Sequence, residues 1–383
     1  MIYLDNAATS FPKPPEVARR VFECLSEWGG SPGRGSYKMS LRASEAIYAC
    51  RESLASLFDL SDPLRVIFTP GDTYSINLVL RGILRPGDHV LCSNLEHNAV
   101  FRPLEELVET RGISYDLFVA YDPTRPLRED EICKDLLSKI RPNTKLVICT
   151  HASNICSVTL PIEKIGKLCR ARGILFCVDA AQSAGRIPIS MENMCIDALC
   201  LPGHKGLFGP AGCGALLLGE GCLPNPLVEG GSGYRSLDAK MPEEPPERYE
   251  AGTLPTPAII GLRAGVDFVR RTGVEAIGKR ERELTERLKE RLRYLPGIKI
   301  YAPEEEGSIL LFSSDRYPAS AIGDALDRFG FCLRTGFHCA ALAHRTLRTP
   351  KEGALRASPG FFNAAWEVDA LADRLAVILK DGI

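Results

Sequence analysis

The sequence predicts an α/β protein with a large domain built on a mostly parallel sheet and a smaller C-terminal α+β domain. Short apolar runs of strand length alternate with amphipathic segments of helix length between residues 66 and 205. Polar or ionisable residues follow several of these runs, as expected where ligands bind at the carboxyl ends of parallel strands. The length of 383 residues exceeds what one hydrophobic core usually serves, so two domains are expected.

The N-terminal residues, 1–15, are predicted to form an extended segment because three prolines end it. Apolar residues at helical spacing then predict helices over 16–28 and 40–58. The residues between them, 29–35, are rich in glycine and proline and are expected to form a loop.

Strand-like runs then recur, and helical segments follow most of them. The runs lie at 66–68, 89–92, 145–149, 174–178 and 197–201, and the helices begin near Thr73, Asn98 and Ile162. Because the carboxyl ends of parallel strands meet at one edge of a sheet, the side chains there are expected to share a site. These side chains are Thr69, His97, Thr150, Asn154, Asp179 and Lys205.

The large domain is predicted to cover residues 16–260 and to end in an irregular, proline-rich stretch. A linking helix, or two, follows over 261–295, and the small domain covers 296–383. Its expected elements are strands at 298–301, 308–312 and 331–334 and helices at 319–329 and 366–380.

Composition excludes several classes of protein. A net charge of -1 gives no electrostatic reason to expect nucleic acid or an anionic membrane as partner. The first residues lack a basic region followed by an apolar core, and no apolar run approaches a membrane span, so a cytoplasmic protein is expected. The 14 cysteines form no CxxC pair, which argues against a zinc site or redox dithiol and favours reduced thiols and no metal.

Asp179 and Lys205 are the two strand-end residues with the most specific chemistry. An aldehyde cofactor with a protonatable ring nitrogen, pyridoxal phosphate (PLP), needs a lysine amine and an acidic partner of this kind. Taken singly, Asp179 is as well explained as a helix cap and Lys205 as a surface lysine. The pair, within the motifs DAAQ (179–182) and GHK (203–205), favours the cofactor.

DAAQ followed by GHK resembles the fold-type I PLP enzymes of the class V aminotransferase group, most closely the cysteine desulfurase and selenocysteine lyase family. The resemblance extends from YLDNAAT (3–9) to RAS (356–358). It implies that Lys205 forms the imine with PLP and later moves the Cα proton of the substrate. It also implies that Asp179 keeps the pyridine nitrogen protonated.

The same resemblance implies roles for three further side chains. Gln182 would reach the phenolic oxygen of PLP, and Asn154 would contact that oxygen and the substrate carboxylate. His97, in LEHNA, would stack on the ring; the alternative is a helix N-terminal histidine satisfied by solvent.

The phosphate is expected at a turn before a helix, where backbone donors point outward. The turn is 69–73, which includes Asp72 and supplies the hydroxyl of Thr73, and His204 is the second expected contact. Many family members have a serine where this chain has Pro202, so one hydroxyl is missing. Thr253 resembles the threonine that reaches the phosphate of the other subunit, which implies a homodimer.

Cys339 lies in the segment RTGFHCA (334–340), which is similar to the desulfurase segment whose cysteine attacks the substrate sulfur. His338 is a candidate for assisting thiolate formation. The alternative is a packed cysteine of the small domain. Arg356, seventeen positions later, would bind the substrate carboxylate as a bidentate fork. That spacing leaves little room for a long mobile sulfur-delivery loop.

The resemblance therefore implies a PLP-dependent cysteine desulfurase that converts L-cysteine to L-alanine and passes sulfur from a Cys339 persulfide to an acceptor, as in iron–sulfur cluster assembly. Selenocysteine lyase is the nearest alternative. A more distant alternative is a class V aminotransferase or a β-elimination lyase, neither of which would need Cys339. A scaffold protein without catalytic activity would not need the cofactor-binding residues, and this chain has all the main ones.

Overall fold

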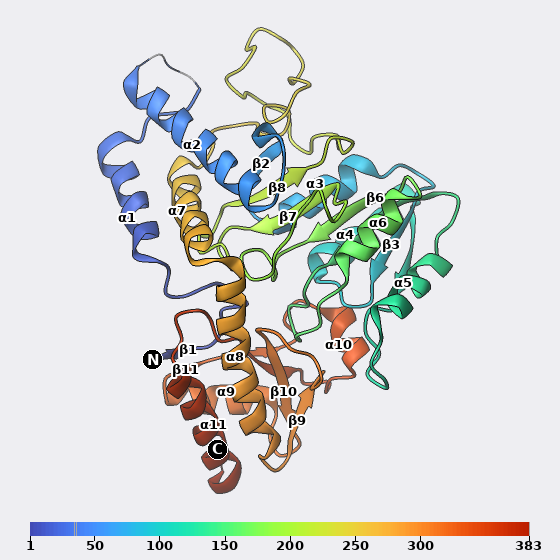
Figure 1. The fold of residues 1–383 in the computed structure, drawn as a ribbon, viewed down its shortest axis with the longest axis vertical. Helices are drawn as coiled ribbons and strands as arrows, with labels where there is room; N and C mark the ends of the chain where they lie inside the picture. Colours follow the sequence, from blue (N-terminus) through green and yellow to red (C-terminus); the bar gives the residue numbers. More distant parts are fainter. Residues whose placement is uncertain (34, 36, 383) are drawn as a thin grey trace.

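The computed structural model describes residues 1–33, 35 and 37–382. Positions 34, 36 and 383, which fall within the predicted loop and the ranges 16–260 and 296–383, lie outside the described residues. The structure has a large sheet domain and a small domain, which helix α8 (Val274–Arg293) joins (Figure 1). This confirms the predicted α/β fold class.

The large domain contains a seven-stranded sheet in the order β2-β8-β7-β6-β5-β3-β4. Strands β3 to β7 run parallel to one another, and β8 is antiparallel to both of its neighbours. Their bounds are β2 Val66–Thr69, β3 His89–Ser93, β4 Ser114–Phe118, β5 Thr144–Thr150, β6 Leu175–Asp179, β7 Ala198–Pro202 and β8 Gly214–Leu218. The sheet is therefore mostly parallel, as predicted, and β4 and β8 are the strands that the hydrophobic runs did not reveal.

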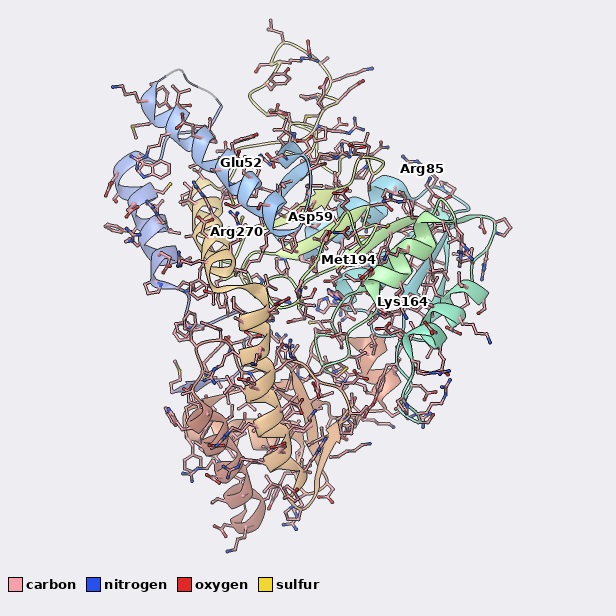
Figure 2. The ribbon with its side chains drawn as sticks, in the orientation of Figure 1. Glu52, Asp59, Arg85, Lys164, Met194 and Arg270 are labelled. Carbon is pink, nitrogen blue, oxygen red and sulfur yellow. The ribbon has the colours of Figure 1, made fainter. Side chains whose placement is uncertain are left out.

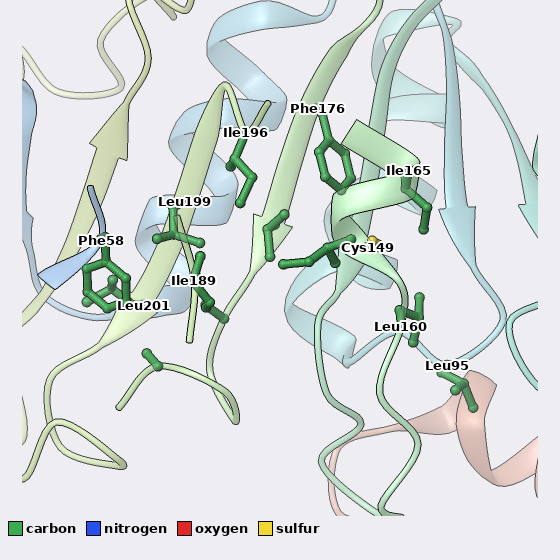
Figure 3. Packing of buried hydrophobic residues seen from close by; sticks show 14 of the residues in the cluster. Phe58, Leu95, Cys149, Leu160, Ile165, Phe176, Ile189, Ile196, Leu199 and Leu201 are labelled. Carbon is green, nitrogen blue, oxygen red and sulfur yellow. The ribbon is translucent and has the colours of Figure 1, made fainter. Parts of the chain in front are cut away.

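Helices cover both faces of this sheet because alternate strand residues point to opposite sides. One face packs on α2 (Lys38–Leu57), α5 (Glu129–Ser138), α6 (Ile162–Arg170) and α7 (Thr256–Thr272). Figure 3 shows part of that layer, where Phe176 and Leu199 of neighbouring strands pack among side chains such as Ile165. The other face packs on α3 (Asp72–Ile83) and α4 (Asn98–Arg111). A further helix, α1 (Pro15–Glu23), packs on α7.

The small domain has a four-stranded antiparallel sheet in the order β12-β13-β10-β9. Its strands are β9 Ile298–Tyr301, β10 Leu310–Ser314, β12 Arg334–Gly336 and β13 Ala354–Ala357, and its helices are α9 Ala319–Arg328, α10 Ala341–Leu347 and α11 Ala365–Asp381. The predicted linking segment, 261–295, is divided between α7 and α8 (Val274–Arg293), because Gly273 between them has φ +92.

The N-terminal segment belongs with the small domain. Its strand β1 (Ile2–Tyr3) pairs in parallel with β11 (Phe331–Cys332), and Asp5 forms a bridge with Ser358. Figure 1 accordingly places both ends of the chain beside the lower part of the molecule. Figure 2 shows side chains crowding the space between the two domains. Within the described residues, no helix combines the length and apolarity needed to cross a membrane, and no cluster of metal-ligand side chains occurs.

Candidate active site

A cavity of about 530 Å³ lies at the carboxyl ends of β5, β6 and β7, facing the first turn of α3. This volume is within the range of small-molecule sites. It brings together most of the predicted site residues. Its lining includes Asp72, Thr73, His97, Thr150, Asn154, Asp179, Gln182, Pro202, His204 and Lys205.

Asp179, at the end of β6, and Lys205, three residues after the end of the neighbouring strand β7, both line this cavity. Asp179 ends β6, is 2% exposed, and accepts a hydrogen bond of 2.8 Å from the backbone N–H of Ala181. Burial lowers the pKa of Lys205 to about 8, against the attraction of Asp179 and Asp72. A larger fraction of this amine than of an ordinary lysine is therefore uncharged near neutral pH, and the uncharged form is the one that attacks an aldehyde.

His97 is both a helix cap and a cavity residue. It precedes α4, and its Nδ1 accepts a hydrogen bond of 3.0 Å from the backbone N–H of Ala99. Burial and then the charge of Lys205 lower its pKa to about 4, so the ring is neutral at pH 7. His97 is thus a helix N-terminal histidine, as the predicted alternative has it, because its Nδ1 caps α4. Its ring also lines the cavity.

Glu96 is a buried carboxyl that the sequence reasoning missed. It accepts hydrogen bonds from the backbone N–H of Thr150, at 3.0 and 3.1 Å, and from the Ser93 hydroxyl. Burial raises its pKa to about 8. The carboxyl joins the loop that carries His97 to the end of β5. The only signal in the sequence is an acid next to the motif histidine.

Arg356 is buried beside the cavity, but two of its three nitrogens are already engaged. One terminal nitrogen donates to the Asn154 carbonyl at 2.9 Å, and the other pairs with Asp5 at 2.6 Å. Its Nε has no partner among the described residues. Both terminal nitrogens are therefore paired within the chain, because the bridge from the N-terminal segment brings Asp5 to Arg356, and bidentate binding of a substrate carboxylate by Arg356 stays a prediction. Arg334, directly opposite Arg356 in the β12–β13 pair, adds a second cation nearby.

Cys339 lies on a loop that is held against the large domain. Of the cysteines in the described part of the chain, it alone is exposed. Its carbonyl accepts a hydrogen bond of 2.8 Å from the backbone N–H of Asn98, and the Asn154 amide donates to the His338 carbonyl at 2.8 Å. Both His338 and Cys339 have positive φ, +51 and +56. The loop is thus held by Asn154, which lines the cavity, and by Asn98, which follows the cavity residue His97.

His338 does not serve as the base for Cys339 in this arrangement. Its Nδ1 is 3.1 Å from His344 Nε2, and its Nε2 is 3.3 Å from the Arg334 carbonyl. Burial and the charge of Arg356 lower its pKa to about 3. Both ring nitrogens are engaged, so the expected help in forming the thiolate is not supported, and the ring instead fixes the loop.

The remaining predicted residues fall in two places. Gln182 lines the cavity, yet its amide already donates to the Ala7 carbonyl at 3.0 Å and accepts from Arg186 at 3.2 Å. His204 lines it with a buried Nδ1. Thr253 is exposed and lies on a different hollow, between α2 and the 246–254 segment, so it is not part of this cavity.

The cavity fits PLP by its unsatisfied polar atoms. Among the described residues, buried atoms without a hydrogen-bond partner include Asp72 Oδ1, Asn154 Oδ1 and His204 Nδ1, all on residues that line it. Buried polar groups are normally paired, so such a concentration is expected where a polar group binds. Lys205 and Asp179 match the aldehyde and ring nitrogen, and the first turn of α3 offers backbone N–H groups to the phosphate.

Comparisons with known proteins extend over both domains. The model of the family described as Aminotransferase class-V matches residues 2–371. A "Probable cysteine desulfurase" of Methanothermobacter thermautotrophicus is 32% identical, with 100% of this chain and 95% of that protein aligned. The apo structure of a cysteine desulfurase from Thermococcus onnurineus NA1 has a TM-score of 0.91 at 29% identity, covering 99% of this chain and 95% of that one. The cysteine desulfurase CsdA of Escherichia coli has a TM-score of 0.88 at 26% identity, covering 100% and 95%.

Proposed function

The chain belongs to the class V aminotransferase family and, within it, to the cysteine desulfurases, and we infer from this that it is a PLP-dependent enzyme that converts L-cysteine to L-alanine. One observation carries the assignment. A cavity that holds Asp179 and Lys205 is lined by His97 and Asn154, and the loop of the exposed Cys339 is held by Asn154 and by Asn98, the residue after His97. The names of the relatives favour cysteine over the selenocysteine alternative.

Bound PLP supplies an electron sink for the negative charge that develops at Cα when its proton leaves. Lys205 Nζ is placed to take and return that proton, because burial holds its pKa near neutrality. Asp179 would hold the proton at the ring nitrogen, and His97, whose ring is neutral at pH 7, would pack against the cofactor. Cys339 Sγ would attack the substrate sulfur while the Cβ–S bond of the substrate breaks. The electron pair of that bond stays on the substrate, whose Cβ then takes a proton, so that a persulfide remains on Cys339 and alanine is the product.

The substrate carboxylate is drawn to the cationic end of the site. The Nε of Arg356 has no partner among the described residues and can donate to the substrate carboxylate. Arg334 lies opposite Arg356 in the β12–β13 pair and adds a second positive charge. Full bidentate binding at Arg356 would require Asp5 to give up its ion pair, so Asp5 competes with the substrate for this guanidinium.

A homodimer completes each site in this proposal, with Thr253 of one copy reaching the phosphate of the other. Support comes from the exposed position of Thr253 and from exposed apolar side chains on nearby elements. These are Tyr37, Met39, Leu41 and Tyr48 near α2 and Val228, Tyr234 and Leu237 in the irregular stretch. Exposed apolar side chains gathered in one region are typical of subunit interfaces.

The remaining parts of the proposal concern location and sulfur transfer. A cytoplasmic location is supported by the fourteen cysteines, which are all free in the described structure. The exposed thiol of Cys339 is accessible to a protein acceptor, as a route to iron–sulfur clusters requires.

The experiment that tests the function incubates the PLP-loaded protein with L-cysteine and a reductant and measures alanine and sulfide. Cys339→Ala is expected to abolish both, whereas Cys195→Ala, which alters a half-buried thiol away from the cavity, leaves them unchanged. L-Selenocysteine is assayed in parallel. Undiminished alanine from Cys339→Ala contradicts the desulfurase mechanism, and faster turnover of selenocysteine than of cysteine favours the lyase.

A further inference from the structure

A second buried carboxyl lies beside Asp179. Asp72, the first residue of α3, is 9% exposed, and its carboxyl is in hydrogen-bonding contact with that of Asp179, which is 2% exposed. Among the described residues, neither carboxyl is within ion-pair distance of a lysine or arginine. Two buried carboxylates cannot both remain charged in such contact, since desolvation and mutual repulsion both oppose it.

The two carboxyls differ in their other partners, and this decides which of them is charged. Asp179 accepts a backbone N–H bond at 2.8 Å, which stabilises a carboxylate. Asp72 Oδ1 is buried with no partner within the described structure. A hydrogen bond between two carboxyls requires a proton on one of them, because an ionised carboxylate only accepts. That proton belongs on Asp72.

The surrounding charges agree with this assignment. Burial and the charge of Asp179 raise the pKa of Asp72 well above its usual range. Lys205 is the cation that faces both carboxyls, and the charge of Asp179 also contributes to the raised pKa of Glu96, from the loop before α4. With Lys205 charged and Asp179 ionised, a neutral Asp72 leaves the pocket balanced. An ionised Asp72 would add an unpaired anion at the turn expected to receive the phosphate.

We propose that Asp72 is a positioning residue that keeps its proton and donates it to Asp179, so that a single oriented carboxylate faces the cofactor ring nitrogen. The part of this proposal that concerns the cofactor ring nitrogen rests on the proposed function. The proton shared by the two carboxyls does not, because it depends on the protein alone. The sequence prediction assigned Asp72 only a place in the phosphate turn, so this role for its carboxyl is new.

The first test measures thermal unfolding of the PLP-free protein as a function of pH. A carboxyl whose pKa is raised on folding stabilises the fold at low pH, and this stabilisation is lost as pH rises through the folded pKa. Asp72→Asn keeps a donor to Asp179 but has no proton to lose. Between about pH 5 and 9, the Tm of the wild type is expected to fall relative to this variant by roughly 2 °C per pH unit over part of the range.

Two controls make this result specific. Glu52→Gln, which neutralises an exposed carboxyl on α2, is expected to follow the wild-type curve. In an Asp179→Asn background, the pH-dependent effect of Asp72→Asn is expected to shrink without vanishing, because the neighbouring charge is gone while burial, the larger cause of the raised pKa of Asp72, remains. Parallel curves for wild type and Asp72→Asn, or an equal effect of this substitution in both backgrounds, would overturn the shared proton.

The second test titrates PLP into the same proteins and follows the long-wavelength absorbance of the bound cofactor. Asp72→Ala, which cannot donate, is expected to bind PLP about tenfold more weakly, whereas Asp72→Asn stays within about threefold of the wild type. Equal binding by the alanine and asparagine variants would overturn the positioning role. Proteins that show the pH difference but take up no PLP would contradict the proposed function and leave the carboxyl pair supported.

Discussion

The histidines and the lysine around the cavity owe their protonation states more to burial than to charged neighbours. Burial is the largest cause of the lowered pKa of His97 and His204, each to about 4, and of Lys205 to about 8. At pH 7 the histidines are therefore neutral and act through shape and hydrogen bonds. Lys205 is the one basic side chain lining the cavity whose charge changes near neutral pH.

This predicts a pH dependence for PLP uptake by the cofactor-free protein. Only the uncharged amine attacks the aldehyde, so the uptake rate is expected to rise with pH and to level off above about 8. Stopped-flow absorbance measures the rate. A rate that still climbs above about pH 9, as expected for a lysine near its ordinary value of 10.5, would contradict the lowered pKa of Lys205.

At the scale of elements, the strand ends were predictable and the contacts between distant segments were not. Asp179 and Lys205 follow apolar runs, so the rule for parallel sheets is enough to place them together. Asp5 and Arg356 are 351 positions apart, and their ion pair depends on the pairing of the two ends of the chain, which no local periodicity reveals. The same holds for the contact between Asn98 and the Cys339 loop.

That contact predicts a defect in Asn98→Ala. The Asn98 side chain accepts the backbone N–H of Ala341 at 3.3 Å, and its loss frees the residues after Cys339. Alanine production is expected to fall about fivefold to tenfold in kcat, the effect of one hydrogen bond, with the absorbance of bound PLP unchanged.

Asn143→Ala is the matched control, because Asn143 is exposed, lies outside the cavity and loses one hydrogen bond of 2.8 Å from its side-chain amide to the Gly87 carbonyl. A normal kcat for Asn98→Ala would show that the loop is positioned without this side chain.

At the scale of the whole molecule, the single chain leaves Thr253 outside its own cavity. If the site is shared between two copies, chains carrying Lys205→Ala and Thr253→Ala complement each other, because one site of a mixed dimer receives both intact residues. Co-expression is expected to restore about a quarter of wild-type activity, since half of the dimers are mixed and each has one good site.

The reference for this experiment is wild type co-expressed with the chain that carries both substitutions. Its mixed dimers contain no intact site, so only wild-type dimers contribute. If the Lys205→Ala and Thr253→Ala mixture gains nothing over Thr253→Ala alone, Thr253 does not act across an interface.

The most direct test of the central claim is to reduce the PLP-loaded protein with borohydride and to locate the cofactor by peptide mass spectrometry. The structure predicts one modified peptide, with the group on Lys205, and loss of that modification in Lys205→Ala. Modification of another lysine, or none at all, would contradict the assignment of this cavity as the PLP site.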